Sequence, residues 1–229
     1  MENLLLKYFG KDFPVSESAP VPCERPFITI SREFGCPSKL IAEKLAKSLN
    51  SHSLHKTSPE WRFINKEVVL ESARELELDP DKVKYFFDAE KRGTLDDILA
   101  SFSSNYKSNI KILKTIRQVI RAFTSGGYVI LVGRGGVAIT YHCPRSLHIR
   151  LQAPLDWRVQ AVAKHHDLSQ EEAMRLTLET DKKRKAMIEL FLNKKMDESL
   201  FDLIFNCSRM SQEEIVRSVV HVMEMKKMI

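Results

Sequence analysis

Short continuous apolar runs alternate along the chain with stretches in which apolar residues recur every three or four positions. The run that starts at Phe27 is rich in β-branched and aromatic residues and predicts a strand. After a short loop containing Gly35, Ile41, Leu45 and Leu49 repeat at four-residue spacing. This spacing predicts an amphipathic helix that ends near Leu49.

Three further apolar runs, at 128–132, 147–151 and 201–205, predict three more strands. The run at 128–132 is apolar almost throughout, as expected for a strand buried on both faces of a parallel sheet. Each of the four predicted strands is followed by a helix or by a loop that opens one. We therefore predict an α/β fold with a three-layer parallel sheet built from right-handed βα units.

The stretch between the first and second predicted strands is helical in pattern. We expect helices near 65–77, 80–91, 95–104 and 107–124, which together form a helical insertion at about 63–125. Residues 1–25 precede the first strand, carry Pro14, Pro20 and Pro22, and are predicted to be an extended lead-in. One domain, 26–229, is then expected, with its core at 26–62 and 126–229.

Two capping boxes mark helix starts in the C-terminal part of the chain. Ser169 with Glu172, and Ser211 with Glu214, have the Ser-x-x-Glu spacing in which each side chain caps the other's backbone N–H. Between them lies a basic stretch that includes Lys182–Lys185. This stretch is predicted to be a basic helix, and its charged cluster fits a solvated helix face about as well as a functional role.

Composition and charge narrow the class of protein. The 229 residues are 43% hydrophobic and 29% charged, as in ordinary globular domains. Since no apolar run approaches the roughly 20 residues needed to span a bilayer, and the N-terminus does not resemble a signal peptide, we expect a cytoplasmic protein without a membrane partner. The net charge of +6 favours anionic partners such as nucleotides, whereas the scattered basic residues argue against nucleic acid.

The cysteines and histidines point to no metal centre. Cys23, Cys36, Cys143 and Cys207 form no Cys-x-x-Cys pair, so reduced thiols are expected. His52 and His55 have ligand-like spacing, and His165 and His166 lie together at an expected helix end, but neither pair is completed by other ligands. No residue is therefore predicted to bind a metal directly.

The loop after the first strand has the chemistry of a phosphate site. A strand, a glycine-containing loop and a helix N-terminus together present backbone N–H groups and positive dipole to an anion. Arg32 and Lys39 flank this loop and add charge. A second turn of similar kind, Gly133-Arg134-Gly135-Gly136, follows the second predicted strand. Taken alone, the first loop fits an ordinary βα connection better than a phosphate site.

Five short motifs in order resemble those of the cytidylate kinase-like family, a branch of the P-loop nucleoside monophosphate kinases. They are Ile-Ser-Arg-Glu-Phe-Gly at 30–35, Val-Gly-Arg-Gly-Gly at 132–136, Ala-Pro-Leu-x-x-Arg at 153–158, Thr-Asp-Lys-x-Arg at 180–184 and Asn-Cys-Ser-Arg at 206–209. The resemblance spans about 26–225. It implies a P-loop NTPase-type core, an acceptor-binding insertion and a basic helical lid, at about 168–197, that closes over both nucleotides.

The resemblance also implies roles for individual residues. ATP phosphates would be bound by Arg32, Gly35, Cys36, Pro37, Ser38, Lys39 and Leu40. The acceptor would be bound by Arg134, Gly135 and Arg158, and the transferring group would be stabilised by Lys39, Lys182 and Arg184. Trp61 and Phe63, just before the insertion, fit either stacking on a base or packing in the core.

The phosphate loop departs from the Gly-x-x-x-x-Gly-Lys-Ser/Thr pattern of a Walker loop. Ser38 stands at the lysine position, Lys39 at the Ser/Thr position, and Pro37 replaces a glycine and removes an N–H donor. Gly135 occupies a place that is acidic in cytidylate kinases. Mg²⁺ is thus expected to enter with ATP, held by phosphates and waters, with Ser31 or Glu33 as the nearest candidate protein contacts.

Three functions are compatible with these residues. The first is a transferase that moves a phosphoryl group from ATP to a nucleoside monophosphate, with CMP or dCMP as the expected acceptor. The second is a pseudoenzyme that binds ATP without turnover. The third, a basic nucleic-acid-binding protein, lacks a repeat of aromatic and basic residues. We take the first as the prediction; the acceptor base and the oligomeric state are left open by the sequence.

Overall fold

The computed structural model describes residues 23–52, 59–64 and 106–229, and everything below concerns those residues. The helices predicted at 65–77, 80–91 and 95–104, and nearly all of the N-terminal extension, lie outside them. The helical insertion therefore stays a prediction for most of its length. Only its last helix is described, as α6 (Tyr106–Gly126).

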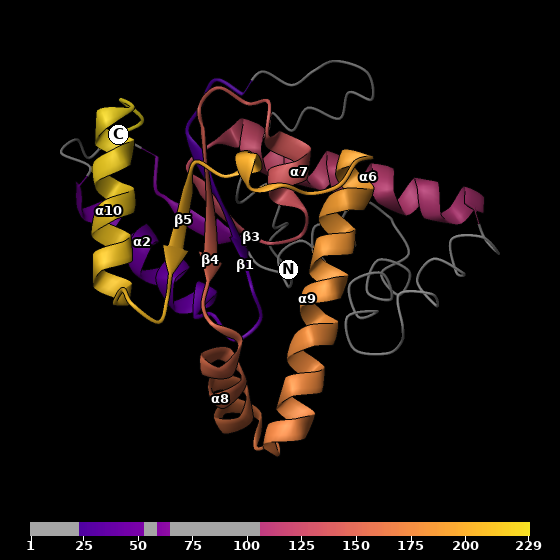
Figure 1. Cartoon of the computed structure of the whole chain (residues 1–229). Coiled ribbons are helices and arrows are strands. Elements are labelled where there is room, and N and C mark those ends of the chain that lie inside the picture. The colour runs from indigo at the N-terminus through magenta and orange to yellow at the C-terminus, as the bar shows by residue number, and fades with distance from the viewer. Residues whose placement is uncertain (1–22, 53–58, 65–105) are drawn as a thin grey trace, which may run out of the picture.

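A five-stranded parallel sheet forms the centre of the fold (Figure 1). Its strands are β1 (Phe27–Arg32), β2 (Arg62–Ile64), β3 (Val129–Val132), β4 (Ser146–Gln152) and β5 (Leu203–Asn206). They are arranged in the order β2-β3-β1-β4-β5, and every neighbouring pair is parallel. This arrangement confirms the predicted α/β fold.

Helices cover both faces of the sheet, which gives three layers (Figure 1). One face carries α2 (Ser38–His52) and α10 (Gln212–Met225), and the other carries α6, α7 (Gly136–Thr140) and part of α9 (Gln170–Leu192). The short helix α8 (Leu155–His166) extends past the end of the sheet beside α9. In the described part of the chain, no helix is long and apolar enough to cross a bilayer.

The strand β3 is buried on both faces because its apolar residues do not alternate with polar ones. In β3, Ile130 and Val132 join the apolar cluster with α2 and α10, whereas Val129 and Leu131 join the cluster with α6 and α7. Successive side chains of a strand point to opposite faces, so a continuous apolar run fills both layers. The interpretation of residues 128–132 as such a strand is confirmed.

Both predicted capping boxes are present. The Ser169 hydroxyl accepts the N–H of Glu172 at 3.3 Å and begins α9, and Ser211 does the same for Glu214 at 3.2 Å in α10. Each glutamate side chain returns a bond to the backbone of its serine. The basic helix of the predicted lid is α9.

One strand was not predicted from the sequence. β2 has three residues and lies at the edge of the sheet, where it pairs with β3 through Arg62, Phe63 and Ile64. The apolar runs predicted four strands, and Phe63 was expected at the start of the insertion. Because Phe63 and Ile64 belong to the sheet, the core extends at least to Ile64. A run this short has no readable periodicity, and its strand conformation depends on backbone bonds to β3. Trp61 is buried in the core.

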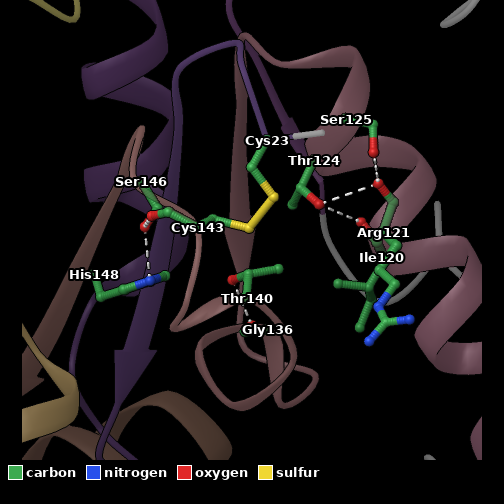
Figure 2. Close-up of a disulfide and its surroundings, with 10 residues drawn as sticks. All are labelled: Cys23, Ile120, Arg121, Thr124, Ser125, Gly136, Thr140, Cys143, Ser146 and His148. Atoms are coloured by element: carbon green, nitrogen blue, oxygen red, sulfur yellow. Dashed lines mark hydrogen bonds between the residues drawn. A yellow bond between two sulfur atoms is a disulfide. The ribbon is translucent and has the colours of Figure 1, made fainter. Parts of the chain in front are cut away.

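Cys23 and Cys143 form a disulfide, although the sequence analysis expected four reduced thiols (Figure 2). Cys23 precedes β1 and Cys143 precedes β4, and these neighbouring strands are parallel, so their amino ends lie side by side. The two Cα atoms are therefore 5.4 Å apart despite a separation of 120 residues. Chain spacing alone does not reveal this proximity. The other two cysteines, Cys36 and Cys207, are free and buried.

His148 is a buried imidazole in the middle of the sheet. Its Nδ1 lies 2.7 Å from the Thr29 hydroxyl and its Nε2 lies 2.9 Å from the Ser146 hydroxyl. Both partners are neutral groups that serve as donor or acceptor. Burial lowers the pKa of His148 from 6.5 to about 4, even though the nearby Asp202 carboxylate acts in the opposite direction.

This histidine is expected to make the protein less stable in mild acid. Between pH 6.5 and about 4 the unfolded chain binds a proton at His148 that the folded state rejects, so the free energy of unfolding falls as the pH falls. The expected loss from about pH 7.5 to about pH 5 is about 2 kcal/mol. Urea titrations across this range would measure it. The variant His148→Gln should show a flatter pH dependence, and an unchanged slope would contradict the assignment.

Candidate active site

The predicted motifs meet at the carboxyl edge of the sheet. Backbone bonds join the segments after the strands: Glu33 N–H donates to Leu151 at 2.9 Å, Gly133 N–H to Ile30 at 2.9 Å, and Cys207 N–H to Gln152 at 2.8 Å. In open parallel sheets this edge is where ligands bind. Four of the five motifs thus lie together because parallel strands end on the same side, and the fifth reaches this edge on α9.

The loop 33–37 connects β1 to α2. It is a tight turn, in which the Cys36 N–H donates to the Glu33 carbonyl at 3.3 Å and the Ser38 N–H to the Cys36 carbonyl at 2.8 Å. Gly35 has φ +92°, and a Cβ there would lie 2.9 Å from both the Cβ and the carbonyl oxygen of Arg158. Only glycine fits, since both the backbone angle and the close approach of α8 exclude a side chain.

The turn after β3 carries Arg134 in a strained conformation. Gly133, Arg134 and Gly135 have φ of 74°, 56° and 67°, all in the left-handed region. For an L-residue such as arginine this region costs roughly 1–2 kcal/mol. Arg134 is nevertheless 6% exposed, which means that the surrounding structure holds it there. Strained, buried polar residues of this kind gather at functional sites.

Arg32 and α9 contact this turn. A Cβ on Gly133 would lie 1.8 Å from Nη1 of Arg32, so the guanidinium lies directly on the glycine. A Cβ on Gly135 would lie 2.4 Å from the ring of Phe191 on α9. Arg184 of α9 donates from Nη1 to the Arg32 carbonyl at 3.4 Å. The structure therefore brings Arg32, the arginine turn and Arg184 together.

The side chains of the two predicted lysines are exposed. Lys182 is exposed on α9, and the side chain of Lys39 is 74% exposed, 4.0 Å from Glu43 on its own helix. Lys183, which the sequence analysis did not single out, is instead 7% exposed. A signal was available, because Thr177, Thr180 and Lys183 follow one another at three-residue spacing on α9, whereas Lys182 lies off this row.

A second group that the sequence analysis overlooked is an ion-pair network around Arg158. This arginine donates to Asp181 at 2.6 Å, lies 3.2 Å from Glu33, and also donates to the carbonyls of Ala153 at 2.9 Å and Phe34 at 3.1 Å. Arg150 adds a longer contact of 3.7 Å to Glu33. The Arg158 guanidinium, expected to bind the acceptor, is thus occupied by bonds to the protein.

The remaining residues assigned to ATP phosphates line the start of α2. Cys36 and Ser38 are buried, Pro37 is half-buried, and the Leu40 side chain is 50% exposed. The hydrogen bond with Cys207, together with burial, raises the pKa of the Cys36 thiol, which is therefore neutral and a poor nucleophile. The N–H groups of Lys39 and Leu40 have no acceptor within the helix, by the geometry of a first turn.

The described residues contain no group of three or more metal-ligating side chains that fits a metal ion. Glu33, one candidate contact for Mg²⁺, has Oε2 bonded to the Ala153 N–H at 3.1 Å and ion-paired with Arg158. The donors gathered at this edge are guanidinium, ammonium and backbone N–H groups, which suit phosphate oxygens.

These observations define an α/β protein whose loops and buried cations meet at the carboxyl edge of a parallel sheet. The chain belongs to the cytidylate kinase-like family, because the model of that family matches residues 27–209. The match covers β1 through the motif after β5, in agreement with the resemblance found in the sequence.

A solved structure shares the fold. An uncharacterized protein from Eubacterium ventriosum ATCC 27560 is 20% identical, with a TM-score of 0.60 over 88% of this chain and 99% of that chain. A shikimate kinase from Bacteroides thetaiotaomicron is 13% identical, with a TM-score of 0.47 over 87% and 98% of the two chains. At these identities the likeness concerns the fold alone.

The match to a curated relative covers a smaller part of this chain. A uronate isomerase from Corynebacterium glutamicum is 30% identical over 131 residues, which are 56% of this chain and 25% of that protein. The chain therefore spans about a quarter of the length of this relative.

Proposed function

We propose that this protein transfers a phosphoryl group from ATP, supplied with Mg²⁺, to a nucleoside monophosphate, with CMP or dCMP as the acceptor. The observation that carries the proposal is Arg134. A buried arginine is held in a strained left-handed turn at the carboxyl edge of the sheet, in the turn that Arg32 contacts at Gly133. Membership of the cytidylate kinase-like family supports the reaction class.

Each group has a role that follows from its chemistry. The N-terminus of α2, with the first-turn N–H groups of Lys39 and Leu40 and the helix dipole, binds the ATP phosphates. Arg134 binds the acceptor phosphate, for which a planar guanidinium supplies two parallel donors. Arg184 and Lys183 come from α9 and neutralise charge on the group in transfer, the main demand of phosphoryl transfer. Mg²⁺ enters as part of the nucleotide substrate.

A second function, ATP binding without turnover, is favoured by one observation. The side chain of Lys39 is 74% exposed, and no other lysine stands at the start of α2 in place of a Walker lysine. Among the described residues, Arg184 and Lys183 of α9 would then have to supply the positive charge for the transferring group in place of such a lysine. Both functions include ATP binding, but only the transferase turns ATP over.

The test is ADP production by purified protein with Mg-ATP and a panel of nucleoside monophosphates. We expect CMP or dCMP to raise the rate at least about tenfold above the ATP-only background, a difference of about 1.4 kcal/mol in barrier. Protein carrying Arg134→Gly, prepared in parallel, controls for contaminating kinases. No turnover with any acceptor, in protein that still binds ATP, would favour the pseudoenzyme. Nucleic-acid binding that weakens steeply with salt would favour the third function.

A further inference from the structure

Phe34, in the loop 33–37, contacts residues of both α8 and α9 through its backbone and its ring. Its N–H donates to Oδ1 of Asp181 at 2.7 Å, and its carbonyl accepts from Nη1 of Arg158 at 3.1 Å. Its ring lies 5.2 Å from the guanidinium carbon of Arg184 and stacks at 5.9 Å on His166. Two of these four residues come from α8 and two from α9.

Asp181 connects these contacts. One carboxylate oxygen accepts the Phe34 N–H and the other accepts Arg158 Nη1 at 2.6 Å. Both bonds are charge-assisted, which makes them roughly twice as strong as bonds between neutral groups. The carboxylate therefore joins a backbone group of the loop, an arginine of α8 and the helix α9 in one network.

Because Phe34 lies in the middle of the turn, this network affects the conformation of the whole loop 33–37. Phe34 lies between Glu33, whose carboxylate bonds the Ala153 N–H, and Gly35, which packs directly on Arg158. Cys36 follows at once and is 9% exposed. Because the residues on both sides of Phe34 contact the segment 153–158, a movement of Phe34 would disturb the whole turn that begins α2.

We propose that Asp181 and Phe34 are positioning residues, which hold the phosphate loop in its ATP-binding geometry by tying it to the α8–α9 hairpin. The proposal deepens the proposed function, on which its kinetic part rests. Neither residue needs to touch a nucleotide: Asp181 acts through the Phe34 backbone, and Phe34 acts through the loop. A helix of the lid then sets the shape of the loop that binds the ATP phosphates.

The first test measures the loop itself, independently of any activity. Cys36 is the reporter, and its alkylation by iodoacetamide is followed by peptide mapping. We expect Asp181→Ala and Phe34→Ala to speed this alkylation about tenfold or more, since the loop opens locally. The matched control is Glu179→Gln, an exposed carboxylate on the same helix, which should leave the rate within about twofold. Unchanged alkylation in both alanine variants would overturn the proposal.

Local opening and general loss of stability are separated by urea. A local opening exposes little surface, so the faster alkylation should not depend on dilute urea, whereas global unfolding rises steeply with it. If the alanine variants fail to fold, Asp181→Asn and Phe34→Leu replace them. Alkylation that rises with urea in every variant would mean a purely structural role and would also overturn the proposal.

The second test separates the two substrates. With the kinase assay, Asp181→Asn should raise the KM for ATP about tenfold and leave the KM for the acceptor within about twofold. The amide oxygen of asparagine still accepts the Phe34 N–H but loses the ion pair with Arg158, so its effect should be smaller than that of Asp181→Ala. Equal changes in both KM values would overturn the positioning role. Absence of turnover in the wild type would defeat the proposed function alone, because the alkylation test stands without it.

Discussion

Replacing Arg134 by glycine is expected to reduce kcat/KM for the acceptor by about 10³-fold or more, as does removal of other arginines that bind a phosphoryl group. Glycine adopts φ of 56° without strain, so the turn keeps its shape and only the guanidinium is lost. The affinity for ATP should stay within about threefold, because the loop 33–37 and α2 are untouched. Steady-state kinetics with varied acceptor, together with ATP binding by calorimetry, would measure both.

The choice of glycine makes this variant informative. Alanine at a positive φ would add strain, and a loss of activity would then have two explanations. The matched control is Asn193→Gly, which removes an exposed residue at φ 54° outside the site and should leave kcat/KM within about twofold. An acceptor kcat/KM that survives in Arg134→Gly, or an equal loss of ATP affinity, would contradict the role given to Arg134.

The variant Arg158→Met is expected to lower the free energy of unfolding by about 2–4 kcal/mol. Methionine fills much of the same space but leaves the carboxylates of Glu33 and Asp181 without their cation. The side chain of Arg158 is 7% exposed, whereas those of Glu33 and Asp181 are 23% and 25% exposed, so water recovers part of the loss. Urea unfolding at neutral pH, followed by far-UV circular dichroism, would measure the difference.

Another basic residue of α8, Lys164, provides the control for Arg158→Met. Lys164 lies on the exposed side of α8, and Lys164→Met should change the free energy of unfolding by less than about 0.5 kcal/mol. The double variant Arg158→Met with Asp181→Asn should be less destabilised than the sum of the two single variants, since the second change removes a charge that the first leaves unpaired. Additive effects would mean that Arg158 stabilises the fold through packing alone.

The layered fold could be predicted from the sequence because it depends on local patterns. Apolar runs such as 128–132 exceed what a half-exposed strand requires and therefore predict a central strand. The serines that begin α9 and α10 stand three residues before glutamates, and this spacing alone determines a cap. β2 was not predicted because three residues at a sheet edge show no periodicity. Its pairing partner, β3, lies 67 positions further along the chain.

The candidate site was predicted in part. The glycines around Arg134 pointed correctly to a turn with unusual backbone angles, and the order of the motifs identified the family. Which cation of the lid faces inward was not predicted: a one-residue step on a helix turns a side chain by about 100°, and Lys182 is exposed where Lys183 is buried.

Apart from β2, the sequence by itself determined the strands of the sheet, their order along the chain and the family, because helix and strand periods, caps and glycine turns are properties of neighbouring residues. The tertiary structure alone decided the contacts between distant residues. The bonds of Asp181 to Phe34 and Arg158 span 147 and 23 positions, and the disulfide joins residues 120 positions apart. Such contacts arise where parallel strands end together and a helix returns over them, and no local pattern records where that helix comes to lie.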